Sequence, residues 1–202
     1  MLRADQQIIA SLIEPNSKVI DIGCGKGELL QILEQDKNVR GHGIELEYDR
    51  VAEAVGQGLS VIQGDADIDL VHYPDNGFDY TVLALTLQVM KDPKAALQHC
   101  LRIGKQAIVV IPNFGHIANR WYLIKNGKMP ISRQLSYQWY ETPNIHFCTI
   151  KDFLELCYEV DCSIEQRIAL YNNKSHKCFD GCRPFGANLF AKQGIFILKS
   201  KS

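Results

Sequence analysis

The stretch Val19-Ile20-Asp21-Ile22-Gly23-Cys24-Gly25-Lys26-Gly27-Glu28-Leu29-Leu30 decides the fold of this 202-residue chain. It opens with an apolar run typical of a buried strand, continues through three glycines at alternate positions, and closes on apolar residues at helical spacing. Glu45 follows 18 positions after Gly27, at the end of a second apolar segment. A strand, a glycine loop, a helix and a later acid in this order predict a doubly wound α/β sheet with a site for an adenosine-containing ligand.

The spacing of the glycines indicates which ligand the loop takes. A dinucleotide loop reads Gly-x-Gly-x-x-Gly, and its third glycine would stand where this chain has Glu28. The spacing here is Asp-x-Gly-x-Gly-x-Gly, with Asp21 at the strand end. This pattern resembles the S-adenosyl-L-methionine (SAM) site of class I methyltransferases. An NAD-dependent enzyme is a weaker alternative, because both the spacing and the acid argue against it.

Alternation of strands and helices continues to residue 112. We expect strands at 18–22, 39–45, 59–63, 78–85 and 106–111, and helices at 5–13, 28–34, 48–55 and 93–103, the last capped by Asp92. A helix at 150–158, capped by Thr149, and two antiparallel strands at 163–170 and 189–198 should complete the chain. The fold class is therefore α/β and Rossmann-like: a seven-stranded, mostly parallel sheet with helices on both faces. We expect residues 1–202 to form a single domain with a helical, aromatic insert at 113–148, after the fifth strand.

Acids end three successive predicted strands, at Asp21, Glu45 and Asp65. Ligands of such sheets bind at the carboxyl ends of the strands. Asp21 would accept from the ammonium of SAM, Glu45 from both ribose hydroxyls, and Asp65 from the adenine amino group. Each acid alone has a plain structural explanation, but their order favours a site. The expected cofactor-binding residues are Asp21, Gly23, Cys24, Gly25, Gly27, Glu45, Leu46, Asp65 and Ala66, for SAM or its product S-adenosyl-L-homocysteine (SAH).

Catalytic groups are sparse where a methyl acceptor would bind. The loop after the fourth strand, residues 85–90, has no acid and no histidine, and only Thr86 and Gln88 offer polar side chains. His146 is a candidate general base, although it could equally be a histidine that only bonds to the backbone. His176, Cys178 and Cys182 provide three metal ligands without a fourth, so we expect no metal site.

Composition excludes several classes of protein. A net charge of −1 does not fit a nucleic-acid-binding domain. No apolar run approaches the ~20 residues of a membrane span, and the first residues lack a signal-peptide core. Seven cysteines, an odd number without paired spacing, favour reduced thiols. We therefore expect a cytoplasmic protein that binds neither nucleic acid nor membranes.

Four further segments identify a family. They are residues 85–90, Pro-Asn-Phe-Gly-His at 112–116, Asn-Gly-Lys-Met-Pro at 126–130, and residues 138–146. With them, the whole chain resembles the bacterial methionine biosynthesis family MetW, whereas methyltransferases in general share only the glycine loop. The chain departs from that pattern at Ile117-Ala118, where a Trp-Arg pair would be expected.

The resemblance implies a methyltransferase fold in methionine biosynthesis and a partnership with homoserine O-acetyltransferase (MetX). It implies no proven methyl acceptor, so an active methyltransferase on an unidentified small molecule or protein remains the alternative. The insert 113–148 holds both tryptophans, and we expect it to dock the partner, although a substrate lid or a plain helical cover would have similar composition. The sequence also leaves a homodimer open. The candidate anchors are Trp121, Arg133, Trp139 and Tyr140.

Overall fold

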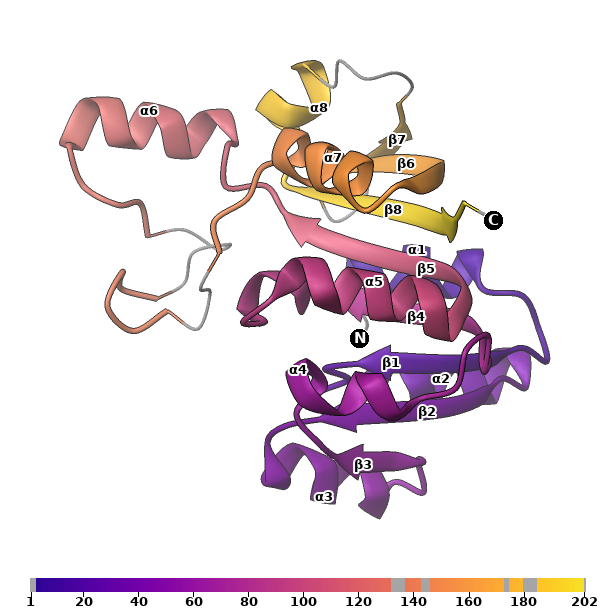
Figure 1. The fold of residues 1–202 in the computed structure, drawn as a ribbon. Coiled ribbons are helices and arrows are strands. Elements are labelled where there is room, and N and C mark those ends of the chain that lie inside the picture. Colours follow the sequence, from indigo (N-terminus) through magenta and orange to yellow (C-terminus); the bar gives the residue numbers. More distant parts are fainter. Residues whose placement is uncertain (1–2, 132–136, 143–145, 173–174, 180–184, 202) are drawn as a thin grey trace.

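A computed structural model describes residues 3–131, 137–142, 146–172, 175–179 and 185–201 (Figure 1). Across these residues one mixed sheet of eight strands has the order β3-β2-β1-β4-β5-β8-β6-β7. The strands are β1 (Lys18–Ile22), β2 (Arg40–Glu45), β3 (Val61–Gln63), β4 (Phe78–Ala84), β5 (Gly104–Pro112), β6 (Cys162–Asn172), β7 (Ser175–Cys178) and β8 (Gln193–Ser200). The predicted α/β fold class is confirmed.

The sheet is parallel on one side and antiparallel on the other. Strands β1 to β5 run parallel to one another, whereas β8 runs antiparallel to both β5 and β6. The antiparallel orientation of the last strand agrees with the prediction. The helices are α1 (Ala4–Leu12), α2 (Glu28–Lys37), α3 (Tyr48–Gly56), α4 (Ala66–Asp69), α5 (Pro93–Ile103), α6 (Ile117–Asn126), α7 (Ile150–Glu159) and α8 (Phe185–Phe190), with 3-10 turns η1 (Leu70–His72) and η2 (Leu87–Val89).

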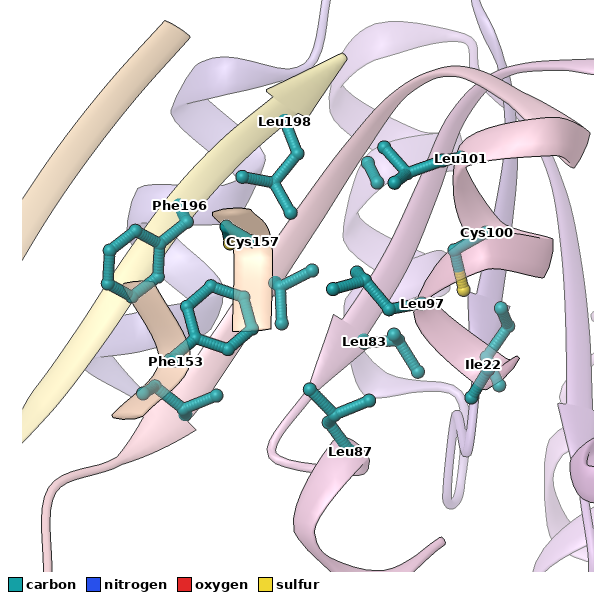
Figure 2. Close-up of a cluster of buried hydrophobic side chains, with 14 of the residues drawn as sticks. Ile22, Leu83, Leu87, Leu97, Cys100, Leu101, Phe153, Cys157, Phe196 and Leu198 are labelled. Atoms are coloured by element: carbon teal, nitrogen blue, oxygen red, sulfur yellow. The ribbon is translucent and has the colours of Figure 1, made fainter. Parts of the chain in front are cut away.

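Helices cover both faces of the sheet. On one face α5 and α7 bury a cluster that includes Leu97, Phe153 and Phe196 (Figure 2). On the opposite face, Ile9 of α1 and Leu33 of α2 belong to a second cluster. Alternate residues of the central strands supply the two clusters, because successive side chains of a strand point to opposite faces. Both faces are apolar, as expected for the parallel core of an α/β protein.

Two details near the end of the chain differ from the prediction. The sequence predicts seven strands, but residues 175–178 pair with β6 and add an eighth at the edge. This short strand is fully exposed and has no apolar alternation that would reveal it. The sequence also predicts the last strand from residue 189, whereas β8 begins at Gln193 because 185–190 form α8.

Candidate functional site

A pocket of about 670 Å³ lies at the carboxyl ends of the parallel strands. Its wall is formed by the glycine loop after β1, the ends of β2 and β3, the turn after β4, and the start of α1. Of the expected cofactor residues, only Gly27 is not part of the wall. The pocket lining therefore includes Asp21, Gly23, Cys24, Gly25, Glu45, Leu46, Asp65 and Ala66.

The three loop glycines all adopt positive φ, which strains other residues. They differ in what a side chain would meet. A Cβ on Gly27 would lie 2.3 Å from the Leu59 side chain, and one on Gly23 would lie 2.6 Å from Thr86, so close packing requires both glycines. A Cβ on Gly25 would meet no atom within 4 Å. Gly25 is therefore needed for its backbone conformation, and it borders the open space of the pocket.

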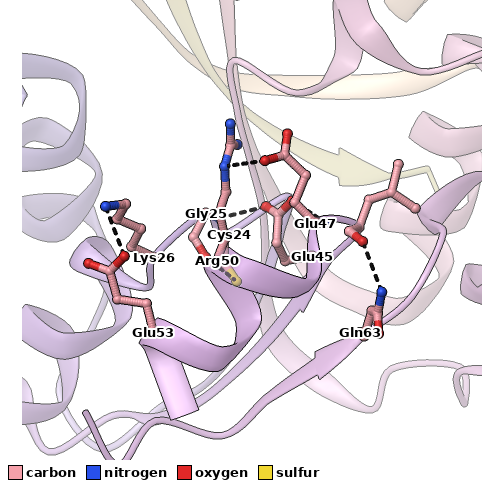
Figure 3. A network of polar contacts seen from close by, with 9 residues as sticks. Cys24, Gly25, Lys26, Glu45, Glu47, Arg50, Glu53 and Gln63 are labelled. Atoms are coloured by element: carbon pink, nitrogen blue, oxygen red, sulfur yellow. Dashed lines mark hydrogen bonds and ion pairs between the residues drawn. The ribbon is translucent and has the colours of Figure 1, made fainter. Parts of the chain in front are cut away.

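Glu45 joins the end of β2 to the glycine loop. Its Oε2 accepts a hydrogen bond from the backbone N–H of Gly25 at 2.8 Å, and its Oε1 accepts one from Glu47 at 3.0 Å (Figure 3). The carboxylate is buried, yet it lines the pocket. A carboxylate has about four lone-pair positions, so two remain for ligand hydroxyls.

Asp21 is the most unusual group in the pocket. The residue is 2% exposed, and its Oδ1 has no hydrogen-bond partner in the described structure. Burial raises the pKa of Asp21 to about 7, partly offset by Arg3 and reinforced by Glu45. A buried carboxylate without a partner is costly. A ligand ammonium would supply both the missing charge and the missing hydrogen bond, so the residue fits the amino group of SAM.

Cys24 lies in the same loop, but its environment does not favour reactivity. Burial raises the pKa of this thiol, and the neighbouring carboxylates of Asp21 and Glu45 raise it further. A thiolate would be the nucleophile. Cys24 therefore remains a neutral thiol that packs against the ligand pocket.

Asp65, the predicted partner of the adenine amino group, already has partners within the protein. Asp65 caps α4, because its Oδ1 accepts from the backbone N–H of Asp67 at 3.0 Å. Its Oδ2 lies 3.7 Å from the Lys91 ammonium. Leu46 remains largely exposed at the rim. Asp65 thus already has two partners, which leaves it less capacity for an adenine amino group than a free acid would have.

The turn after β4 places Thr86 in the pocket wall, but not Gln88. Gln88 is buried: its Nε2 donates to the Leu85 carbonyl at 2.6 Å, and its Oε1 has no partner in the described structure. Leu85 adopts a φ of 65°, a strained conformation for a residue of this size. The backbone N–H of His146 donates to the Gln88 carbonyl at 3.0 Å, while the residue itself is exposed and is not part of the pocket wall.

The sequence interpretation missed Arg3 and Gln6, which line the pocket from the start of α1. No local pattern marks them, since only the packing of α1 brings them to the glycine loop. No cluster of three metal ligands occurs among the described residues. His176 and Cys178 lie on the exposed strand β7, and Cys182 falls outside the described part of the chain.

The Pro-Asn-Phe-Gly-His motif at residues 112–116 anchors the N-terminal end of α6 through hydrogen bonds. The buried Asn113 side chain donates to the carbonyls of Asn188 and Ala191 at 2.9 and 2.7 Å and accepts from the N–H of Gly115 at 3.1 Å. His116 then caps α6, its Nδ1 accepting from the N–H of Ala118 at 3.1 Å. Burial lowers the pKa of His116, which favours the neutral ring that this cap requires.

Beyond this end, α6 extends away from the body of the protein (Figure 1). Residues 120–126 are all exposed, including Trp121 at 64% and Ile124 at 76%. Trp139 and Tyr140 are also exposed and stack edge to face at 5.6 Å. Arg133 lies outside the described residues. No helix in the described ranges is long and apolar enough to cross a membrane.

Comparison with known proteins agrees with this geometry. The sequence model of the family described as "Methionine biosynthesis protein MetW" matches residues 3–198. The "Bifunctional methionine biosynthesis protein MetXA/MetW" of Rhodopirellula baltica is 29% identical over 176 residues, which cover 83% of this chain and 28% of that protein. A ubiquinone/menaquinone biosynthesis C-methyltransferase of Stenotrophomonas maltophilia is 24% identical over 65% of this chain and 60% of its own length. The chain thus spans less than two thirds of either relative.

Solved structures show the same fold. A SAM-dependent methyltransferase of Thermotoga maritima, described as a possible histamine N-methyltransferase, has a TM-score of 0.69 and 18% identity, covering 98% of this chain and 88% of that one. The putative methyltransferase complexed with the Trm112 activator of Haloferax volcanii has a TM-score of 0.69 at 14% identity, covering 99% and 91%. The fold is that of class I methyltransferases, and the family match extends over nearly the whole sequence. The chain belongs to the methionine biosynthesis protein MetW family.

Proposed function

We propose that this chain binds SAM or SAH and acts as a regulatory partner of homoserine O-acetyltransferase. The cofactor part of the proposal is supported by the glycine loop, by Glu45 and by the unpartnered Asp21 carboxylate in one pocket. The partner is suggested by the relative whose name combines MetXA with MetW.

The observation that carries the regulatory role is the chemistry of the turn after β4. Residues 85–90 border the cofactor pocket without an ionisable side chain. A general acid or base that activated a methyl acceptor would have to reach the reacting atom within hydrogen-bond distance. His146, the histidine bonded through its backbone to this turn, is exposed and does not line the pocket. A pocket that fits SAM, beside a turn without an ionisable side chain, suits a sensor better than an enzyme.

Helix α6 supplies the surface for the partner. An isolated helix of ten residues is marginal in water, and most helical stability in proteins comes from packing one face. The residues of the outer turns of α6 are exposed, and they include Trp121, Leu123 and Ile124. A partner that covers this face would stabilise the helix and bury an aromatic anchor of the kind that dominates interface energies.

Co-purification tests the proposal. Homoserine O-acetyltransferase should be retained by the wild-type chain, and its activity should depend on whether SAM is present. Trp121→Ala should weaken the complex by more than about 2 kcal/mol, or roughly thirtyfold. Tyr158→Ala is the matched control, because Tyr158 is an exposed aromatic on α7, outside the insert. Equal retention of the partner by both variants would contradict docking through α6.

An active methyltransferase is the second candidate, and one observation favours it. Methyl transfer from a sulfonium can proceed by positioning alone, so an inert pocket wall does not prevent catalysis. Formation of SAH from SAM in a cell extract, lost in Glu45→Ala, would support this function. Absence of turnover alongside SAM-dependent control of the acetyltransferase would leave the regulatory role as the explanation.

A further inference from the structure

We propose that Arg3, held in place by buried Asp5, binds the carboxylate of the ligand's amino-acid end, so that Arg3 and Asp21 together select a nucleoside that carries an α-amino acid. This inference rests on the proposed function, since it concerns how the same pocket recognises SAM or SAH. It adds a residue outside the glycine loop, and it predicts which ligands the pocket rejects.

The topology brings the two residues together. Val19 and Asp21 are two positions apart on β1, so their side chains leave the same face of the sheet. Val19 packs in one cluster with Ile8 and Ile9 of α1. Asp21 therefore points to the face that α1 covers, and the first turn of α1 reaches the pocket through Arg3.

The guanidinium of Arg3 is oriented by hydrogen bonds. Its Nε and Nη2 donate to the two oxygens of Asp5 at 3.2 and 3.1 Å. The Asp5 side chain is 3% exposed, whereas that of Arg3 is 51% exposed. The backbone N–H of Arg3 also donates to the side chain of Gln6 at 3.0 Å, and Gln6 lines the same pocket. The buried Asp5 carboxylate therefore fixes one edge of the planar Arg3 guanidinium, and the other edge of the guanidinium remains accessible.

The remaining edge has donors to spare. Arginine has five N–H donors, and Nη1 of Arg3 makes no hydrogen bond with any described residue. Its charge acts on the pocket, since Arg3 counteracts the rise in the pKa of Asp21. The Arg3 guanidinium and the buried Asp21 carboxylate line the same pocket, and their charges are complementary to the carboxylate and the ammonium of an α-amino acid. Arginine is the residue best suited to hold a carboxylate through two donors.

The alternative is that Arg3 has a purely structural role at the start of α1. In that case the Arg3–Asp5 pair would cap the helix, and the pocket would not distinguish ligands by their carboxylate. The two explanations differ in their dependence on the ligand. A capping residue affects every ligand equally, whereas a carboxylate-binding residue affects only ligands that carry this group.

Calorimetry with SAM and decarboxylated SAM separates them, because the second compound keeps the ammonium and lacks only the carboxylate. The wild type should bind SAM about tenfold more tightly, as expected for a charge-assisted hydrogen bond. Arg3→Gln should bring the two affinities to within about twofold, by weakening SAM far more than decarboxylated SAM, which loses only the help that Arg3 gives to the ionisation of Asp21. Arg3→Lys should restore part of the preference. Arg40→Gln is the matched control, since Arg40 is exposed at the start of β2 and is not part of the pocket wall, so its loss removes the same charge elsewhere.

The outcomes are distinct. Unchanged preference in Arg3→Gln, equal weakening of both ligands, or a wild type without preference would overturn the inference and leave SAM binding intact. Loss of preference in Arg40→Gln would also overturn it, by showing that only net charge matters. A wild type that binds neither compound would overturn the proposed function itself. Retained binding of decarboxylated SAM by Arg3→Gln shows that the variant is folded.

Discussion

At the scale of single residues, the raised pKa of Asp21 should make the stability of the protein depend on pH. Its pKa is about 7 in the folded protein, against an ordinary value of 3.8. Between these values the folded state binds more protons than the unfolded state, so stability falls as pH rises from about 4 to 7 and stays reduced above 7. Each unit of pKa corresponds to 1.36 kcal/mol, and Asp21→Asn should therefore stabilise the ligand-free protein by roughly 2–4 kcal/mol at pH 8 and little at pH 4. Thermal unfolding across this range measures the effect.

Ligand affinity should show the reverse dependence. SAM should bind the ionised carboxylate, so wild-type affinity should fall about tenfold for each unit below pH 7. Asp21→Asn should bind ten- to hundredfold more weakly at pH 8, because an amide offers no charge to the ammonium, and this variant should lose the pH dependence. Calorimetry at pH 5.5 and 8 is the check. A pH-independent wild type would show that Asp21 does not meet the ligand's charge.

The residues of the site were predictable only where their signal is local. Asp21, Glu45 and the glycines follow one another at diagnostic spacing, and the structure places Asp21, Glu45, Gly23 and Gly25 in one pocket. Arg3 carries no such signal, because tertiary packing alone brings it there. The role of Asp65 as an N-cap could have been predicted from the sequence, because aspartate is common at the position before a helix.

At the scale of elements, the helix caps and the buried strands could be predicted from the sequence. The strand at the edge of the sheet and the direction of α6 could not. Asp92 and Thr149 cap α5 and α7 as predicted, because such caps are defined by neighbouring residues. Strand β7 escaped prediction, since its residues are exposed and only pairing with β6 defines it. Helix α6 was expected as part of an aromatic insert, but its projection follows from Asn113, whose partners lie 75 and 78 positions away.

The substitution Asn113→Ala tests how much the hydrogen bonds of the Asn113 side chain contribute to stability. The change leaves two buried carbonyls and one N–H without their partners, which should lower the free energy of unfolding by about 2–4 kcal/mol. Asn126→Ala is the control, because Asn126 makes a single exposed hydrogen bond to the Tyr122 carbonyl. It should change stability by no more than ~0.5 kcal/mol. Denaturant unfolding of the two variants gives the comparison, and equal stabilities would refute the role of Asn113.

At the scale of the whole molecule, the turn after β4 lines the pocket and is hydrogen-bonded to the end of the insert. Thr86 lines the pocket and contacts the region of Gly23, and Gln88 accepts from the backbone N–H of His146 near the end of the insert. If SAM alters partner affinity, the partner must alter SAM affinity by the same factor. The hydrogen bond between Gln88 and His146 is a direct physical connection through which the two sites could be coupled.

His146→Pro should uncouple the sites, because proline has no N–H to donate to Gln88. We expect the SAM-dependent change in partner affinity, typically five- to 150-fold for coupled sites, to fall towards one in this variant. His146→Ala retains the N–H and should keep the wild-type coupling, whereas a catalytic role for the imidazole would make both variants lose methyl transfer to a similar extent. Titration of the acetyltransferase with and without saturating SAM measures the coupling. Equal coupling in the proline variant and the wild type would show that the signal travels by another route, and a loss of methyl transfer shared by both variants would favour an enzyme over a sensor.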